Sequence, residues 1–471
     1  MSARLRGLGG DLLLAALVAL AFWLNGQLWR LPAAGESTPP VYTAPGAVSN
    51  LRLGEVLRPA RLVLRAPAGG AWLRLPDPQS QAAAALERAA LQLAASVEAG
   101  RLERAPAVRP ADLLGRLEGP AAEILLPAPL PWASWLAVWR SEEAGGAPLA
   151  SLPSGGPSVD RLLIFAAPAA EGQAAPQLEL AAGDASSWHR LPLPQGEAAV
   201  AWLAALKAAQ GEAVAPEAAA LPAGLGAEAD FAGATPPAEG LAAPRLAEIR
   251  PDPEGLGHAV FGDMALVRRV ELVGGQVLFT DGRTLLRFPP RGGYVLERQE
   301  AAGGPDRGLG RALLEAVQEV DRLGGWPAGS RLLAARRLPG EAGWQLAFAA
   351  GDRGLPLLAA AEQAPAAPAE FQTVPPAGAI DVQVSPAGVV ERIAWHVEQV
   401  EGRGGLLRPP SLQAALAAAS AAGSLPAGAT LADAGLAWEP AGVDGAAARP
   451  LWLLTLADGR LVRLPTGAEG G

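Results

Sequence analysis

Hydrophobic and polar residues follow two different periods along the chain, and these periods predict both helices and strands. Apolar residues recur every three or four positions in segments rich in Ala, Leu and Glu, which predicts helices over 79–99, 110–118, 197–209, 310–324 and 410–423. Shorter runs bounded by Gly and Pro predict strands over 60–66, 71–75, 122–126, 161–166, 331–338, 344–350, 379–384, 388–398, 430–438, 450–457 and 460–464. We therefore expect an α+β fold.

The stretch VLFTDGRTLLRF, residues 277–288, places Asp281 and Gly282 between two alternating runs. Asp-Gly between such runs is a strong hairpin signal, because glycine tolerates the positive φ of a tight turn. A catalytic role for Asp281 would need a second acid, a base or a metal ligand beside it. Because Asp-Gly-Arg returns at 458–460 in a second expected hairpin, we interpret Asp281 as a turn residue.

The order of the expected elements divides the chain into parts. Residues 51–245 form an N-terminal α+β region, and its last part, 211–245, is dominated by Ala, Pro, Gly and Glu and is expected to be a loop or linker. From about 260 the elements run hairpin, hairpin, helix, hairpin, and a similar order returns in the last hundred residues. We therefore expect a central domain at 246–368 and a C-terminal domain at 369–471, which resemble repeated β-β-α-β-β modules.

Residues 12–31 are expected to form a transmembrane signal anchor. They are apolar without interruption to residue 24, and twenty residues at ~1.5 Å each span the ~30 Å of a hydrocarbon core. Arg4 and Arg6 precede the span and only Arg30 lies close behind it, which favours a cytoplasmic tail at 1–11 and an extracytoplasmic remainder. A linker at 32–50 then leads into extracytoplasmic mixed α/β domains. A cleaved signal peptide is the alternative, because its apolar region needs only ~7–15 residues.

Two amide side chains, Asn25 and Gln27, lie near the outer end of that span. Side-chain amides in a membrane can hydrogen-bond to a neighbouring helix. The alternative is that both amides lie among lipid headgroups and water.

The composition excludes several classes of chemistry. A net charge of −9 without a basic stripe indicates no nucleic-acid partner. The absence of cysteine excludes thiol catalysis, disulfides and thiolate metal sites, and the three histidines are too scattered for metal ligation. We expect no catalytic, cofactor-binding or metal-binding residues and no enzyme activity. An anchored hydrolase would instead need titratable groups clustered around Asp281, Asp306 or Glu341.

The segment FGDMALVRRVELVGGQVLFTDGRTLLRF, residues 261–288, resembles a segment typical of the YycH (WalH) regulatory proteins of Gram-positive bacteria. In that family an F-x-D-x-S-L-V-R run leads through a glycine to a Y-T-D-G hairpin. The matching residues here are Phe261, Asp263, Leu266, Val267, Arg268, Thr280, Asp281 and Gly282. The departures are Ala265 and Phe279, where the family more often has Ser and Tyr.

The resemblance implies a membrane-anchored accessory protein of the YycFG (WalRK) two-component system. Such proteins have one transmembrane helix and three extracytoplasmic α+β domains, here a YycH-like central domain and a YycI-like C-terminal domain. The implied partners are a sensor histidine kinase of the YycG (WalK) type and a YycI-like single-pass protein, and the implied outcome is control of cell-wall metabolism. Contact between transmembrane helices is part of that mechanism. The resemblance therefore implies that Asn25, Gln27 and the helix face formed by the small residues Ala15, Ala16 and Ala19 contact a partner helix. The alternative function is a tethered module that binds cell-wall material or a small ligand.

Overall fold

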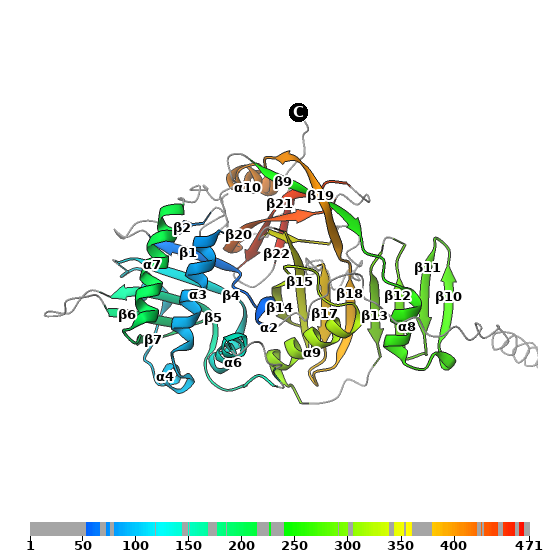
Figure 1. Cartoon of the computed structure of the whole chain (residues 1–471), viewed down its shortest axis with the longest axis horizontal. Helices are drawn as coiled ribbons and strands as arrows, with labels where there is room; N and C mark the ends of the chain where they lie inside the picture. The colour runs from blue at the N-terminus through cyan, green and yellow to red at the C-terminus, as the bar shows by residue number, and fades with distance from the viewer. Residues whose placement is uncertain are drawn as a thin grey trace, which may run out of the picture. The chain divides into compact units, whose positions relative to one another are not determined.

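The computed structural model (Figure 1) describes residues 53–65, 72–75, 80–117, 119–143, 149, 151–167, 177–184, 186–213, 226–227, 240–290, 292–299, 305–338, 343–352, 355–359, 379–421, 425, 428–440, 446–456 and 461–465. Within these ranges, every helix is too short or too polar to cross a membrane. The expected anchor at 12–31 lies outside the described residues.

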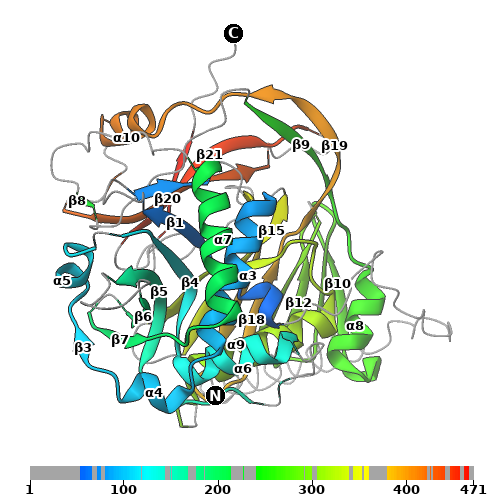
Figure 2. The same cartoon turned by 60° about the vertical axis from the view of Figure 1, so that its left-hand side comes forward.

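The N-terminal region contains an antiparallel sheet. Its strands lie in the order β2 (Trp72–Arg74), β1 (Arg61–Arg65), β4 (Ala121–Pro131), β5 (Ser158–Ala167), β6 (Gln177–Gly183), β7 (Trp188–Pro192) and β3 (Ala107–Val108). Helices α3 (Gln81–Ala95) and α7 (Glu197–Glu212) lie side by side against one face (Figure 2). The short helix α5 (Pro110–Leu114) packs on the other face with a smaller apolar cluster. Helices α2 (Leu53–Val56), α4 (Ala99–Glu103) and α6 (Trp132–Glu143) complete this region.

Local sequence explains where α3 begins and ends. The Ser80 hydroxyl accepts a hydrogen bond from the Ala83 N–H at 3.2 Å, which caps the first turn. At the other end the Ser96 hydroxyl donates to the Leu93 carbonyl at 2.6 Å, and the buried Val97 follows. The helix therefore ends at residue 95 and α4 follows separately, so the prediction of one helix over 79–99 was too long.

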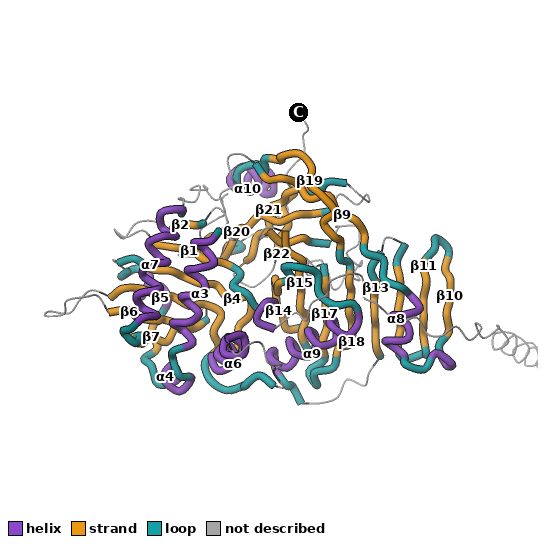
Figure 3. Tube along the Cα trace, in the orientation of Figure 1, coloured by secondary structure: helices purple, strands orange, loops and turns teal. Residues whose placement is uncertain are grey.

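Most of the described strands after α7 belong to a larger sheet (Figure 3). Its main path runs β10 (Arg268–Leu272), β11 (Gln276–Thr280), β12 (Thr284–Phe288), β13 (Tyr294–Arg298), β18 (Val390–Trp395), β17 (Ile380–Val384), β15 (Trp344–Asp352), β16 (Leu355–Leu357), β20 (Thr430–Glu439), β21 (Arg449–Leu456) and β22 (Leu461–Pro465). Strand β14 (Arg331–Arg337) pairs with β15, and β8 (Gly226–Ala227) pairs with β20. Helix α9 (Gly308–Leu323) contacts β15, β17 and β18, α8 (Pro253–Phe261) contacts β12, and α10 (Leu412–Ala421) contacts β22.

The described elements confirm the α+β fold class. The order β12, β13, α9, β14, β15 agrees with the expected module, and β17, β18, α10, β20, β21 repeats it with β19 inserted. Strands β17 and β18, which belong to the expected domain at 369–471, hydrogen-bond between β13 and β15 of the expected domain at 246–368. The two segments thus share one sheet, and their domain boundaries stay a prediction.

A two-stranded antiparallel ribbon of β9 (Leu241–Glu248) and β19 (Glu398–Leu407) was not predicted from the sequence pattern. Residues 241–245 belong to this ribbon, so the prediction of a loop through residue 245 was wrong there. The partner strand lies about 150 residues away in the chain, and such pairing leaves little trace in the local pattern. The Arg403 guanidinium ties the ribbon to the Asp352 carboxylate of β15 through two ion-paired hydrogen bonds, one of 2.6 Å.

Candidate functional site

The residues that resemble the YycH family come together at one end of the larger sheet. Helix α8 begins after Asp252, whose carboxylate accepts from the Glu254 and Gly255 N–H groups, and it ends at Phe261. The Asp263 carboxylate caps the next short turn, η1 (Met264–Leu266), by accepting from the Ala265 N–H at 2.8 Å. The chain then enters β10, and the register places Arg268 directly opposite Thr280 of β11.

Asp281 lies in the turn between β11 and β12. Its carboxylate accepts hydrogen bonds from the Thr284 N–H at 2.7 Å and the Arg283 N–H at 2.8 Å, and it is exposed. The hydrogen bond from Thr284 contributes most to a lowered pKa of Asp281. Gly282 has φ +91°, a conformation that L side chains rarely adopt. This geometry suits a turn and leaves the carboxylate ionised, unlike a general acid.

The other acids named for a hydrolase are engaged elsewhere or lie outside the described residues. The Asp306 carboxylate accepts from the Gly308 N–H at 2.8 Å and pairs with Arg337 at 2.6 Å. Glu341 falls outside the described ranges. Across the described part of the chain, no three His, Asp or Glu side chains gather in a way that could hold a metal ion.

One face of the β10–β12 meander belongs to the core. Phe279 is fully buried and meets the Phe288 ring edge to face, with centroids 6.1 Å apart. Helix α8 covers this face, since a Cβ on Gly257 would lie 3.7 Å from the Phe279 ring. Arg269, opposite Phe279 in the register, reaches from the same face to Glu254 at 3.0 Å and also pairs with Glu271 at 2.7 Å.

The opposite face and the outer edge of this meander are open. Strand β10 is exposed at every position and lies at the end of the sheet, and among the described residues only β11 pairs with it (Figure 1). The exposed fractions are 71% for Leu266, 40% for Val270, 41% for Leu272 and 105% for Val273. We call these four residues and the free side of β10 the β10 edge. Apolar residues concentrated at one sheet edge are typical of a protein contact.

Sequence reasoning included Leu266 in the family motif but missed the exposure of Val270, Leu272 and Val273. The alternation of Val270 and Leu272 was a visible signal that both side chains share one face of a strand. No local pattern shows that this strand is the last in its sheet, because sheet order depends on distant pairing.

Two ionisable groups, Asp381 within the larger sheet and the half-buried His396 just after β18, have shifted pKa values. Burial raises the pKa of Asp381 on β17 to about 7, against the opposing effects of the Arg392 and Arg463 guanidinium groups. Burial lowers the pKa of His396 to about 4, and the nearby charges of Arg392 and Arg287 lower it further. Because a pKa that differs between the folded and the unfolded chain makes stability depend on pH, we use both shifts to predict the pH dependence of unfolding.

The residues proposed for contact with a partner helix, Asn25, Gln27, Ala15, Ala16 and Ala19, lie outside the described residues, and their role stays a prediction.

No family model and no curated protein matches the chain. Among solved structures, the crystal structure of YycH from Bacillus subtilis aligns with a TM-score of 0.55 and 13% identity, over 88% of this chain and 98% of that chain. An uncharacterized protein from Eubacterium rectale aligns with a TM-score of 0.31 and 10% identity, over 53% of this chain and 86% of that chain. The likeness to YycH covers nearly its whole length, which confirms the resemblance seen in residues 261–288 at the level of the fold. This chain therefore has the fold of YycH.

Proposed function

We propose that this chain is a membrane-anchored, non-enzymatic regulator of a sensor histidine kinase of the YycG (WalK) type. The observation that carries the proposal is the fold shared with YycH over 98% of the solved chain. The eight motif residues found at the end of the larger sheet support it independently of the alignment. In this proposal residues 1–11 are cytoplasmic, 12–31 cross the cell membrane once, and the chain after about 32 is extracytoplasmic.

In this proposal the β10 edge makes the protein contact outside the membrane. It binds an extended segment from the extracytoplasmic part of the kinase. A sheet edge offers unpaired N–H and C=O groups to such a segment. Charged side chains often protect an edge from pairing, but Glu254 and Glu271 neutralise Arg269 here. Burying an exposed Leu or Val side chain stabilises a contact by roughly 1.5–3 kcal/mol, so Leu266 and Val273 are suited to anchor the segment.

Contact within the membrane is assigned to Asn25, Gln27 and the face of Ala15, Ala16 and Ala19. Small residues allow two helices to approach closely, and amides add hydrogen bonds between them. Such contacts can alter the kinase only if they differ in strength between its signalling states. A YycI-like single-pass protein is the third member of this assembly.

Co-purification from native membranes tests the proposal. The full chain is compared with a secreted fragment of residues 33–471, and we expect the kinase and the YycI-like protein to be recovered with the full chain only. Asn25→Leu and Gln27→Leu should reduce that recovery. If both forms recover no kinase but bind cell-wall material, the tethered binding module replaces the regulator.

The β10 edge is tested in the same assay with charge substitutions. Val270→Lys and Leu272→Lys place a charge where no core contact is lost, so folding should be unaffected while kinase recovery falls. Val200→Lys is the matched control, because Val200 is an apolar residue with 68% exposure on α7. Equal recovery with all three variants would remove the β10 edge from the proposal.

A further inference from the structure

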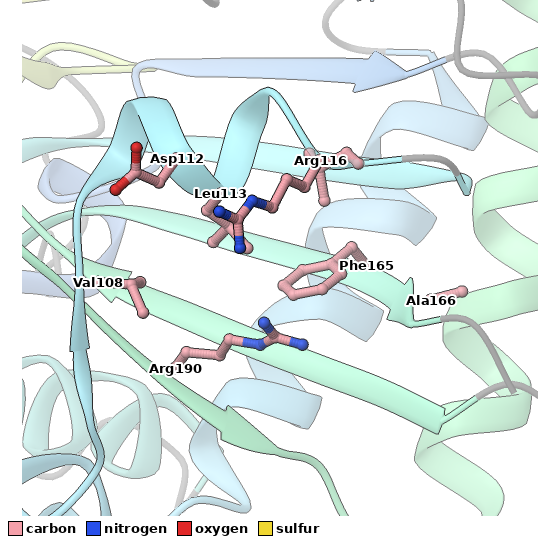
Figure 4. Close-up of a pocket in the computed structure, with 8 residues that line it drawn as sticks. Val108, Asp112, Leu113, Arg116, Phe165, Ala166 and Arg190 are labelled. Atoms are coloured by element: carbon pink, nitrogen blue, oxygen red, sulfur yellow. The ribbon is translucent and has the colours of Figure 1, made fainter. Parts of the chain in front are cut away.

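A pocket of about 110 Å³ opens on the face of the N-terminal sheet that α3 and α7 do not cover. The segment that includes α5 forms one wall, and strands β5 and β7 form the floor (Figure 4). The lining residues are Val108, Asp112, Leu113, Arg116, Leu117, Phe165, Ala166 and Arg190. Most of this lining is apolar, and the charged side chains enter it from two sides.

Arg190 is held in place at the floor of the pocket. Its Nε donates to the Glu179 carboxylate, and its guanidinium carbon lies 5.5 Å from the centre of the Phe165 ring. The hydrogen bond to Glu179 raises the pKa of Arg190, so this side chain is always charged. An arginine fixed through Nε still has its two terminal amino groups available for a planar acceptor.

Arg116 faces Arg190 across the pocket. Figure 4 shows the two guanidinium groups entering from opposite sides, with the Phe165 ring between them. The Arg116 backbone N–H donates to the Leu113 carbonyl at 3.0 Å, but within the described ranges no hydrogen bond or ion pair joins its side chain to another residue. Asp112, the described carboxylate that lines the pocket, is paired with Arg109 at 2.8 Å. Among the described side chains that line the pocket, the positive charge of Arg116 is therefore not balanced by a carboxylate.

We propose that this pocket binds the anionic end of a small organic molecule, a carboxylate or phosphate group attached to an aromatic or aliphatic body. The anionic group lies between Arg116 and Arg190, and the body lies on Phe165 and Leu113. Guanidinium groups match the geometry of both anions. An apolar lining with a few converging polar groups is the usual composition of a small-molecule site.

The volume of the pocket limits the ligand. An apolar cavity of about 150 Å³ holds a benzene molecule, so the 110 Å³ pocket encloses the anionic group and part of the ring or chain that carries it. The rest of the ligand must extend into solvent. This inference is independent of kinase regulation, because it concerns a different face of a different sheet.

Binding of benzoate, phenyl phosphate and benzamide to the purified full-length chain tests the proposal, for example by ligand-observed NMR. Benzoate represents a carboxylate, phenyl phosphate a phosphate, and benzamide the same ring without a charge. We expect at least one charged probe to bind at least tenfold more tightly than benzamide. Arg116→Gln should reduce that affinity at least tenfold, because it removes the unbalanced charge and keeps the side chain polar.

Arg88→Gln is the matched control. Arg88 is an exposed arginine of α3, on the opposite side of the sheet, so its loss should leave binding unchanged. Binding of benzoate alone or phenyl phosphate alone identifies the anion. If benzamide binds as tightly as both charged probes, or if Arg116→Gln binds as the wild type does, the proposal is wrong. Co-purification of the kinase does not depend on ligand binding in this pocket, so each of the two proposals can be refuted without the other.

Discussion

Replacement of Asp381 by asparagine is expected to stabilise the protein, and more at pH 8 than at pH 5. Asp381 is 3% exposed on β17, where its neighbours Ile380 and Val382 point into the main core. Its side chain lies on the other face of the strand, near the charges of Arg392 on β18 and Arg463 on β22. Its Oδ1 is buried and has no hydrogen-bond partner among the described residues, while Arg463 donates to the Ala359 carbonyl and the Glu439 carboxylate.

The magnitude follows from the raised pKa of Asp381. Burial raises it from 3.8 to about 7, so the folded chain binds more protons than the unfolded chain between these pH values. Stability contributed by this group is therefore greatest at low pH and is lost as the pH rises towards 7. At about 1.4 kcal/mol per pKa unit, ionisation costs about 4 kcal/mol above pH 7 and about 2 kcal/mol at pH 5. Asparagine resembles the protonated acid in shape and avoids this cost.

His396 has the opposite effect over much of the same range. Its pKa is about 4 when folded and 6.5 ordinarily, so the unfolded chain binds more protons between these values. Its contribution to stability rises with pH from 4 to 6.5, which opposes the fall caused by Asp381. In the wild type the effects of Asp381 and His396 on the pH dependence of stability nearly cancel. In Asp381→Asn only the effect of His396 is left, so the free energy of unfolding should rise with pH up to about 6.5.

Urea unfolding of the wild type and Asp381→Asn at intervals between pH 5 and 8 measures these differences. Asp112→Asn is the control, since an exposed aspartate should change stability by no more than about 0.5 kcal/mol at any pH. A stability difference between wild type and Asp381→Asn that is constant with pH would refute the assigned ionisation of Asp381. A loss of stability at pH 8 would show that the carboxylate is needed by its arginine neighbours.

Three further predictions concern other parts of the structure. The NMR signals of the His396 ring should remain those of the neutral form down to about pH 5, whereas His396 titration near 6.5 would contradict its burial. Asp281→Ala should cost about 1 kcal/mol in urea unfolding, because two turn hydrogen bonds are lost, and Asp281→Asn should cost less. Arg403→Ala should speed amide exchange in β9 and β19, because the pair with Asp352 ties the ribbon to β15, and unchanged exchange would show that strand pairing alone holds it.

Two long helices rich in Ala, Leu and Glu were predicted well from the sequence. Helix α9 was expected at 310–324 and spans 308–323, and α7 was expected at 197–209 and spans 197–212. The order of strands around α9 was also predicted. These features depend on residue propensity and on spacings within a few turns, so the chain carries their signals locally.

Helix α6 and the last strands of the N-terminal sheet were not predicted. In α6 the tryptophans 132, 135 and 139 pack on one another, with ring centroids 5.6 and 5.7 Å apart, and apolar residues occur around much of the helix. Most polar residues of α6 are gathered at its C-terminal end, from Arg140 to Glu143, so polar and apolar positions do not alternate over its first turns. Strands β6 and β7 take their hydrogen bonds from each other and from β5, so they depend on neighbours that the pattern does not identify.

The sequence by itself determined the α+β class, the hairpin at Asp281 and the resemblance to YycH, because these depend on short spacings and turn residues. Only the tertiary structure decided that β17 and β18 lie between β13 and β15, that β10 ends the sheet, and that Arg116 faces Arg190 across a pocket. In each case the contact joins segments far apart in the chain. Their pairing is selected by the burial of whole faces, which no local window of residues contains.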